Sequence, residues 1–529
     1  MKNMVGFVNG KIYVSFKPLK VREALLIFDG KVMYAGKKKI VEEVCRLMGS
    51  PIVDLEGKVV LPGFIDSHMH LDELGMYLNM IDLRGVESIR ELQEKVRRYA
   101  STSENFWIPG HGWDHEIFSE RRWPTRWDLD EVVKDRPVML TRVCLHAGVL
   151  NTRAMELTGI LNLNLPGVIR DENGDATGIV KEEALEIVRE KFRETLTPTE
   201  YGKFLKDAME YAASQGVTTV GFVSCDERSL KELIRLEKKI RIRIYLNPGR
   251  KKLGEGGMYG TRDLLEALKK LGIRKGFGNE WLKILGIKIL ADGSLGARTA
   301  LLSEPYSDDP STVGAPNIDK NLLEDIVRES HTLGLQMAVH GIGDRTIDMI
   351  LDVYARLKDA KASRHRIEHV SVVREDQIER MAELGVVASV QPHFIITDWW
   401  TEKRLGENRK GWIYPFRSMM EKSIIMGLGT DSPVEPLNPW ETVYAAVTRG
   451  KYEKSDICEE SQNLTLEEAL HAYTLGSTYI MFEENTLGTL EIGKLADFII
   501  VDRDPFCVDE RDLKEIKVLA TYIGGKKVY

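Results

Sequence analysis

Two histidines separated by one residue, His68 and His70, end an apolar run that begins at Val59. Side chains at positions i and i+2 of a β-strand point to the same face, so the two imidazoles can share one metal ion. The alternative is a pair of histidines at a strand end that binds no metal. The other polar residues that follow apolar runs help to decide between the two.

Further apolar runs of strand length follow along the chain, and many of them end at a side chain that can bind a metal. The eight predicted strands end near His70, Cys225, Asn247, Asp292, His340, His369, His393 and Asp431. Metal-binding side chains stand at no fewer than five of these ends, and a random scatter of 11 histidines would not select strand ends repeatedly. In a barrel of parallel strands these side chains would meet at one rim, where active sites lie.

Helix-length amphipathic stretches separate the predicted strands, which indicates repeated βα units and a parallel sheet. Eight units predict an α/β fold with a (β/α)8 TIM barrel over residues 61–484. Both chain ends consist instead of short strands and turns, with Asp29-Gly30 as a strong hairpin signal. Neither end has enough strands for its own core, so residues 1–60 and 485–529 are predicted to form one small β-sandwich domain.

A large insertion at about residues 72–215 follows the first barrel strand and is too long to be a simple loop. It contains four of the nine tryptophans, namely Trp107, Trp113, Trp123 and Trp127. One interpretation is a lid or aromatic pocket wall that binds an apolar or aromatic amine portion of a substrate. The other is that these rings form the insertion's own core, which we favour more for Trp123 and Trp127 than for Trp113.

Composition bears on the partners and on the compartment. The net charge of −7 is spread along the chain and no basic block alternates with aromatic residues, so nucleic acid is not an expected partner. The chain has no run of about 18 apolar residues without a charge, so a membrane span is not expected. The first residues lack a secretory signal pattern, which predicts a cytoplasmic protein. Five scattered cysteines without a C-x-x-C pair predict buried thiols rather than disulfides or a zinc site: Cys45, Cys144, Cys225, Cys458 and Cys507.

Several longer motifs belong to one pattern. They cover residues 62–70, 288–300, 339–344, 365–369, 429–433 and 488–497. Together they are highly specific, and over nearly its full length the chain resembles the amidohydrolase superfamily, in the branch similar to N-substituted formamide deformylase. The resemblance implies a centre with two divalent metal ions at the barrel rim. The implied ligands are His68, His70 and Asp431 for one ion, His340 and His369 for the second, and Lys288 as the bridge between them.

The bridging role of Lys288 needs chemistry beyond an ordinary lysine, because an ammonium group cannot bind a cation. The resemblance implies that carbon dioxide carboxylates Lys288 to an anionic carbamate. That reaction needs a neutral amine, which burial favours. Lys283 is the rival in the same strand, but Lys288 begins the motif at the strand end. The alternative is a Lys288 that pairs with Asp292 in a mononuclear or metal-free site.

Imidazole and carboxylate ligands suit Zn²⁺, while Mn²⁺, Fe²⁺ and Co²⁺ stay open. A hydroxide that bridges two ions would be a nucleophile at neutral pH, because metal coordination lowers the pKa of water from ~15.7 to about 7. Asp431 would be the catalytic proton shuttle, taking a proton from this water and passing it to the leaving amine. A neutral His393 would help to hold the substrate carbonyl oxygen, or it would be structural.

Four further residues are weaker candidates for substrate binding. Arg298 follows a glycine-rich turn and would pair with a substrate carboxylate or anchor its own loop. Trp113 and Asp114 lie in a Gly-Trp-Asp sequence that matches the family pattern. His146 departs from that pattern, because Cys144-Leu145 precedes it where relatives often have Asp-Gly.

The expected function is therefore hydrolysis of a C–N bond in a small-molecule amide, formamide or cyclic amide by a metal-bridging hydroxide. A first alternative is hydrolytic deamination of a nucleobase-like ring, which commonly uses one metal and a glutamate soon after the third histidine. Here residues 341–344 after His340 contain no glutamate, which weakens that alternative. Lactone or peptide hydrolysis and a non-catalytic metal-binding protein are the others. Barrels with a side sandwich often pair, so a homodimer is the expected assembly.

Overall fold

A computed structural model describes residues 4–143, 146–163, 165–247, 257–453 and 459–529. The chain divides into two compact units. Unit 1 comprises Met1–Leu71 and Ala208–Tyr529, and unit 2 comprises Asp72–Asp207. The helix α7 (Pro198–Ser214) crosses the boundary between them.

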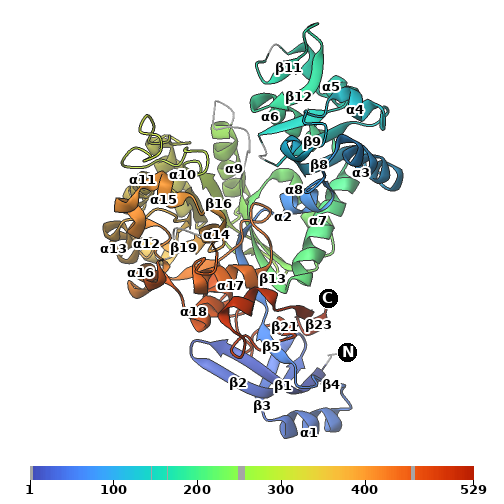
Figure 1. Cartoon of the computed structure of the whole chain (residues 1–529). Helices are drawn as coiled ribbons and strands as arrows, with labels where there is room; N and C mark the ends of the chain where they lie inside the picture. Colours follow the sequence, from blue (N-terminus) through green and yellow to red (C-terminus); the bar gives the residue numbers. More distant parts are fainter. Residues whose placement is uncertain (1–3, 144–145, 164, 248–256, 454–458) are drawn as a thin grey trace. The chain divides into compact units, whose positions relative to one another are not determined.

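The predicted barrel is confirmed as a nearly closed sheet of eight parallel strands in unit 1 (Figure 1). Its strands are β6 (Phe64–Met69), β13 (Val217–Cys225), β14 (Arg241–Leu246), β16 (Leu282–Leu290), β17 (Gln336–Gly341), β18 (Arg366–His369), β19 (Val387–Val390) and β20 (Met426–Leu428). All nine residues of β13 are buried, as expected of a parallel strand that is covered on both faces. Each strand ends within a few residues of its predicted end, so the predicted rim exists.

The first and last barrel strands approach each other closely beyond the end of β20. The amide of Asp431 donates to the carbonyl of His68 (2.8 Å), and the amide of His70 donates to the carbonyl of Ser432 (2.9 Å). Gly429 makes this approach possible, because a Cβ there would lie 2.7 Å from the backbone nitrogen of His68. The backbone thus brings the two ends of the barrel sequence to one point of the rim.

Amphipathic helices alternate with the barrel strands, and α10 shows why they form. In α10 (Lys320–Thr332) the buried residues Leu323, Ile326, Val327 and Ser330 recur at helical spacing, and Asp319 caps its N-terminus. The other helices of unit 1 are α1 (Lys38–Met48), α8 (Glu227–Arg235), α9 (Gly257–Leu271), α11 (Asp344–Tyr354), α12 (Ala360–Ser363), α13 (Glu375–Leu384), α14 (Phe394–Thr397), α15 (Thr401–Leu405), α16 (Phe416–Glu421), α17 (Pro439–Thr448), α18 (Leu466–His471) and α19 (Ser477–Ile480).

Strands from both chain ends form one eight-stranded sheet, blue and red in Figure 1. They are β1 (Met4–Phe16), β2 (Leu19–Phe28), β3 (Lys31–Gly36), β4 (Ile52–Asp54), β5 (Val59–Pro62), β21 (Phe498–Val501), β22 (Val518–Ile523) and β23 (Lys526–Lys527). The predicted hairpin joins β2 and β3, with positive φ at both Asp29 (51°) and Gly30 (77°). The β-sandwich domain boundaries stay a prediction, because this sheet and the barrel belong to the same compact unit.

Unit 2 contains a six-stranded sheet of its own. Its strands are β7 (Ile81–Asp82), β8 (Ile108–Trp113), β9 (Val138–Arg142), β10 (Ala147–Leu150), β11 (Val168–Arg170) and β12 (Ala176–Lys181), and the remaining helices are α2 (Leu71–Leu78), α3 (Ile89–Thr102), α4 (Arg126–Asp130), α5 (Thr152–Thr158) and α6 (Glu183–Thr195). Trp113 is fully buried in the core of this unit, whereas Trp127 is 44% exposed. The order in which we expected the rings to be buried was therefore wrong, because Trp113 ends a central strand and Trp127 lies in the short helix α4.

Two of the five predicted buried thiols are confirmed and one is not. Cys45 and Cys225 are buried, whereas Cys507 is exposed, with its sulfur 3.4 Å from an oxygen of Asp504. Cys507 lies in an exposed turn that follows β21. Cys144 and Cys458 lie outside the described residues. Among the described helices, none is both long enough and apolar enough to cross a bilayer.

Candidate metal centre

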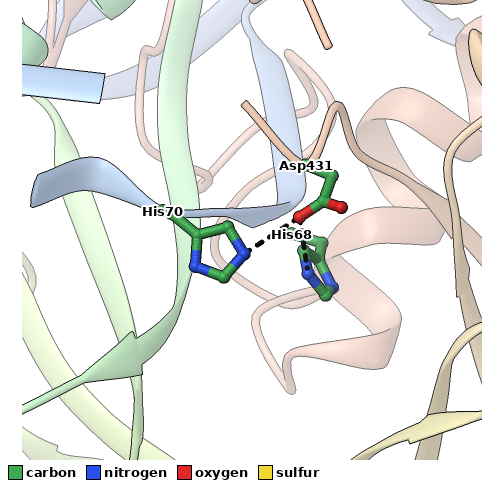
Figure 2. Close-up of side chains that lie close together, drawn as sticks. All are labelled: His68, His70 and Asp431. Atoms are coloured by element: carbon green, nitrogen blue, oxygen red, sulfur yellow. Dashed lines mark ion pairs between the residues drawn. The ribbon is translucent and has the colours of Figure 1, made fainter. Parts of the chain in front are cut away.

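His68, His70 and Asp431 meet at the rim where β6 and the segment after β20 converge. Oδ1 of Asp431 lies 3.2 Å from Nε2 of His68 and 3.0 Å from Nε2 of His70. Figure 2 shows the carboxylate of Asp431 directed at both rings. One ligand atom from each residue lies within 4.8 Å of the other two. Two imidazole nitrogens and one carboxylate oxygen at this spacing are a donor set for one divalent transition-metal ion.

The buried polar atoms of this group support the presence of an ion. Within the described part of the chain, Nε2 of His68 and Oδ1 of Asp431 are buried and face each other at 3.2 Å, but neither forms a hydrogen bond of suitable geometry. Buried polar atoms without partners are costly, and a cation between these atoms would satisfy both. The residues therefore fit the metal that the resemblance implies.

The second group of predicted ligands lies on neighbouring strands of the same rim. The ring centroids of His340 and His369 are 4.4 Å apart, and those of His68 and His369 are 4.8 Å apart. In the register between β16 and β17, Lys288 pairs with Ala338, so it stands two residues before the position opposite His340. The structure thus brings His340 and His369 together beside His68 and places Lys288 on the adjoining strand.

Burial gives Lys288 the property that a carbamate requires. Its side chain is 2% exposed, and burial lowers the pKa of its amine, which favours the neutral form. The rival Lys283 donates to Glu483 at 2.6 Å and is bound there. Among the described residues, Asp292 forms no ion pair with Lys288: its Oδ2 accepts from the backbone amides of Leu301 and Gly343, and its Oδ1 lies 3.3 Å from Nε2 of His340.

Hydrogen bonds at one nitrogen of each ring determine which nitrogen can bind a metal. Nδ1 of His68 lies 2.5 Å from Glu368, and Nδ1 of His369 lies 2.7 Å from Oε1 of Gln391. Nε2 of His340 lies 2.9 Å from the carbonyl oxygen of Gly293. All three partners are acceptors, so each facing nitrogen donates its proton. The lone pairs that remain are on Nε2 of His68, Nε2 of His369 and Nδ1 of His340.

The charges of the centre follow from burial and from close neighbours. Burial alone would raise the pKa of Asp431, but His68 and His70 together hold it well below its usual range. Burial lowers the pKa of His369 well below its usual range, so its ring is a neutral ligand. Asp66, which accepts from Thr430 at 2.7 Å, has its pKa raised to about 7 by burial. The centre therefore offers a neutral imidazole at His369 and an anionic carboxylate at Asp431.

Backbone strain coincides with two of the predicted ligands. His369 has φ +72° and Asp431 has φ +60°, although neither is glycine. Residues in this region cost about 1–3 kcal/mol each and persist where the surrounding structure holds them for a purpose. Their placement at the rim is consistent with a functional centre.

His393 follows β19 and its ring contacts two carboxylates. Nδ1 bonds to Oε2 of Glu435, and Nε2 lies 3.5 Å from Oε2 of Glu441. Glu435 is buried and also accepts from Thr397 at 2.7 Å. A neutral His393 with its proton on Nδ1 has only a lone pair on Nε2. The expected role of a neutral donor therefore conflicts with this geometry, and donation from Nε2 requires the imidazolium form.

The weaker substrate-binding candidates have other partners. Arg298 forms two bonds to Asp308 (3.1 and 2.8 Å), which matches the alternative that it anchors its loop. Asp114 accepts from Arg142 at 2.6 Å in unit 2. The indole of Trp113 donates to the carbonyl of Leu140 at 2.9 Å, and its complete burial contradicts a direct substrate contact. His146 is exposed in unit 2, with Nδ1 3.4 Å from Glu182.

Two acidic residues behind the centre were missed by the sequence reasoning. Glu368 bonds to His68 and Glu435 bonds to His393. Glu368 lies inside the motif of residues 365–369, and its alternation with Arg366 in a buried strand could have indicated an internal ion pair. No local signal identifies Glu435, because its partner is 42 residues away.

Comparison with known proteins indicates one family. The profile described as "Amidohydrolase family" matches residues 51–529. A solved structure from Pyrococcus horikoshii OT3, described as an uncharacterized metal-dependent hydrolase, is 42% identical with a TM-score of 0.84, over 96% of this chain and 99% of that one. The YtcJ protein of Bacillus subtilis (strain 168), which carries an amidohydrolase name, is 30% identical over 98% of both chains. The N-substituted formamide deformylase of Arthrobacter pascens is 25% identical over 95% of this chain and 94% of its own.

Proposed function

Because the chain belongs to the amidohydrolase family, as its motifs predicted, we propose that it hydrolyses a C–N bond in a small amide, formamide or cyclic amide. The observation that carries the proposal is the group of His68, His70 and Asp431, whose ligand atoms lie within 4.8 Å of one another. The deformylase relative, which aligns over nearly the whole chain, directs attention to N-substituted formamides among these substrates.

In the proposed centre, His68, His70 and Asp431 would hold one ion, His340 and His369 would hold a second, and a carboxylated Lys288 would supply a ligand to both. Bound divalent ions, most simply Zn²⁺, would supply Lewis acidity and an activated water. The three hydrogen bonds behind the histidines keep the required lone pairs directed at the centre. The buried amine of Lys288 favours the neutral form that carboxylation needs.

We assign proton transfer to Asp431. Its Oδ1 faces both His68 and His70, while the carboxylate retains a second oxygen for the attacking water. A carboxylate in that position can take a proton from the water and deliver it to the amine as the C–N bond breaks. His393, paired with Glu435, is positioned to stabilise the developing negative charge on the carbonyl oxygen if it is an imidazolium.

Exposed apolar side chains of the barrel favour a substrate that carries an apolar substituent. Leu290 ends β16, pairs with His340 in the register and is 38% exposed. Val434 follows Asp431 by three residues and is 60% exposed. Exposed apolar residues this close to the predicted ligands are suited to contact an apolar group beside the scissile bond. The proposal that the amine portion of the substrate is apolar or aromatic is therefore supported by Leu290 and Val434 at the barrel rim, and Trp113 does not support it.

A substrate panel tests the proposal. The protein, reconstituted with Zn²⁺ or Mn²⁺ and bicarbonate, is assayed against N-substituted formamides, simple amides, cyclic amides, a lactone, a dipeptide and an aminopurine. We expect turnover of the first three classes with kcat/KM of about 10⁴ M⁻¹s⁻¹ or more for the best member. The Asp431→Asn variant serves as the matched control for contaminating activity. Release of ammonia from the aminopurine alone would contradict the proposal and favour deamination.

A further inference from the structure

A buried ionic network lies behind His68. Glu368, which is fully buried, contacts Nδ1 of His68 through Oε2 and binds the guanidinium of Arg366 through both oxygens. Arg366 also donates to the carbonyl of Ser67 (2.8 Å) and to the hydroxyl of Tyr245 (3.0 Å). One arginine thus fixes both the carboxylate and the backbone that precedes His68.

The two histidines predicted to hold the second ion have weaker supports. His369 donates to the side-chain amide oxygen of Gln391, and Nε2 of His340 lies 2.9 Å from the backbone carbonyl oxygen of Gly293, with Oδ1 of Asp292 farther away at 3.3 Å. The Nδ1 of His68, in contrast, lies 2.5 Å from the carboxylate of Glu368. The two proposed metal positions therefore differ in how closely a carboxylate contacts their histidine ligands.

This difference has a consequence for metal binding. A carboxylate that accepts the ring proton fixes the orientation of the imidazole and increases the basicity of its free nitrogen. Loss of such a partner typically costs 10–100-fold in metal affinity. A neutral amide orients the ring but adds less electron density. The ligand atoms of His68, His70 and Asp431 are also already gathered within 4.8 Å, so little rearrangement opposes binding there.

We propose that Glu368, held by Arg366, is the positioning residue that makes the site of His68, His70 and Asp431 retain its ion more tightly than the site of His340 and His369. The inference rests on the two-ion centre of the proposed function. It adds an order of loading and release, in which the His68 site fills first and empties last. The aromatic hydroxyl of Tyr245 extends the same network to Gln336, at 2.7 Å, so the support reaches into the barrel interior.

Chelator titration of the Zn²⁺-loaded protein tests the inference directly. We expect two release steps in the unaltered protein, and a Glu368→Gln variant whose tighter step is weakened 10–100-fold while the weaker step changes by less than about 3-fold. The matched control is Glu483→Gln. Glu483 is also a buried carboxylate, paired with Arg243 (3.1 Å) and Lys283 (2.6 Å), away from the predicted ligands. The Glu483→Gln variant should have a lower thermal stability than the unaltered protein, with neither release step changed.

A second variant keeps the test decisive if Glu368→Gln does not fold. Gln391→Glu would place a carboxylate behind His369, and we expect it to tighten the weaker step and narrow the gap between the two. Unchanged release in both variants, or equal weakening of both steps by Glu368→Gln, would overturn the inference. Two ions bound with equal affinity in the unaltered protein would also overturn it and leave the proposed function standing. Failure of the unaltered protein to bind any ion would contradict both the inference and the proposed function.

Discussion

Asp398 provides a prediction whose size can be worked from the structure. It ends α14, accepts from the hydroxyl of Tyr414 at 3.3 Å and lies near the negative charge of Glu435. Burial, and then Glu435, raise the pKa of Asp398 from 3.8 to about 7. The folded protein therefore favours a protonated Asp398, whereas the unfolded chain ionises it near its ordinary value.

The sign of the pH effect follows from proton binding. Between about pH 4 and pH 7 the folded state binds this proton and the unfolded state does not, so stability falls as pH rises through that window and is flat above it. The pKa of Asp398 rises by roughly three units, and each unit corresponds to about 1.4 kcal/mol. Above pH 7, ionisation of Asp398 therefore lowers the free energy of unfolding by at most about 4 kcal/mol. Asp398→Asn removes the charge and keeps an acceptor for Tyr414.

We therefore expect Asp398→Asn to gain stability relative to the unaltered protein as pH rises from 5 to 8, by several degrees in apparent Tm. Thermal scans at half-unit pH intervals measure this gain. Asp509→Asn is the control, because Asp509 is exposed and its pKa is lowered, so it is ionised in both states throughout this range. Parallel pH curves for Asp398→Asn and the unaltered protein would refute the reasoning.

Other substitutions separate catalysis, positioning and folding. Asp431→Asn should retain much of the bound metal and lose about 10²–10⁴-fold in kcat, and unimpaired turnover would exclude it as proton shuttle. Glu435→Gln should lower kcat by about 10–100-fold at constant metal content, because His393 loses its charged partner. KM should change less than kcat. Unchanged kinetics would indicate that His393 has a structural role. Trp113→Ala should cost about 3–5 kcal/mol in unit 2, measured as faster limited proteolysis, and lost activity without lost stability would indicate substrate contact instead.

The barrel, and the strand ends at which the predicted ligands lie, were predictable because their signals are local. An apolar run bounded by a polar residue shows where a strand ends, and βα alternation shows that these ends share a rim. His68 and His70 are two residues apart, so their common face follows from strand geometry alone. The Asp29-Gly30 turn was equally local, and both residues adopt the positive φ that such a turn requires.

Contacts between distant residues could not be predicted in this way. Glu368 is 300 residues from His68, so only the folded barrel reveals that it supports the ring. The partner of Arg298 is close in sequence, at Asp308, but a glycine-rich turn alone does not say which way the guanidinium points. Trp113 was misjudged because a tryptophan near polar residues suits a pocket wall as well as a core. Its complete burial depends on the sheet of unit 2.

The number of metal ions per chain tests the central claim most directly. Elemental analysis of the purified protein, before and after reconstitution with Zn²⁺ and bicarbonate, measures this number for the unaltered chain and for Lys288→Ala. We predict about two transition-metal ions in the unaltered protein and a clear loss in the variant, because the carbamate bridge is removed. Essentially no bound metal after reconstitution, or the same number with and without Lys288, would contradict the bridged two-ion centre.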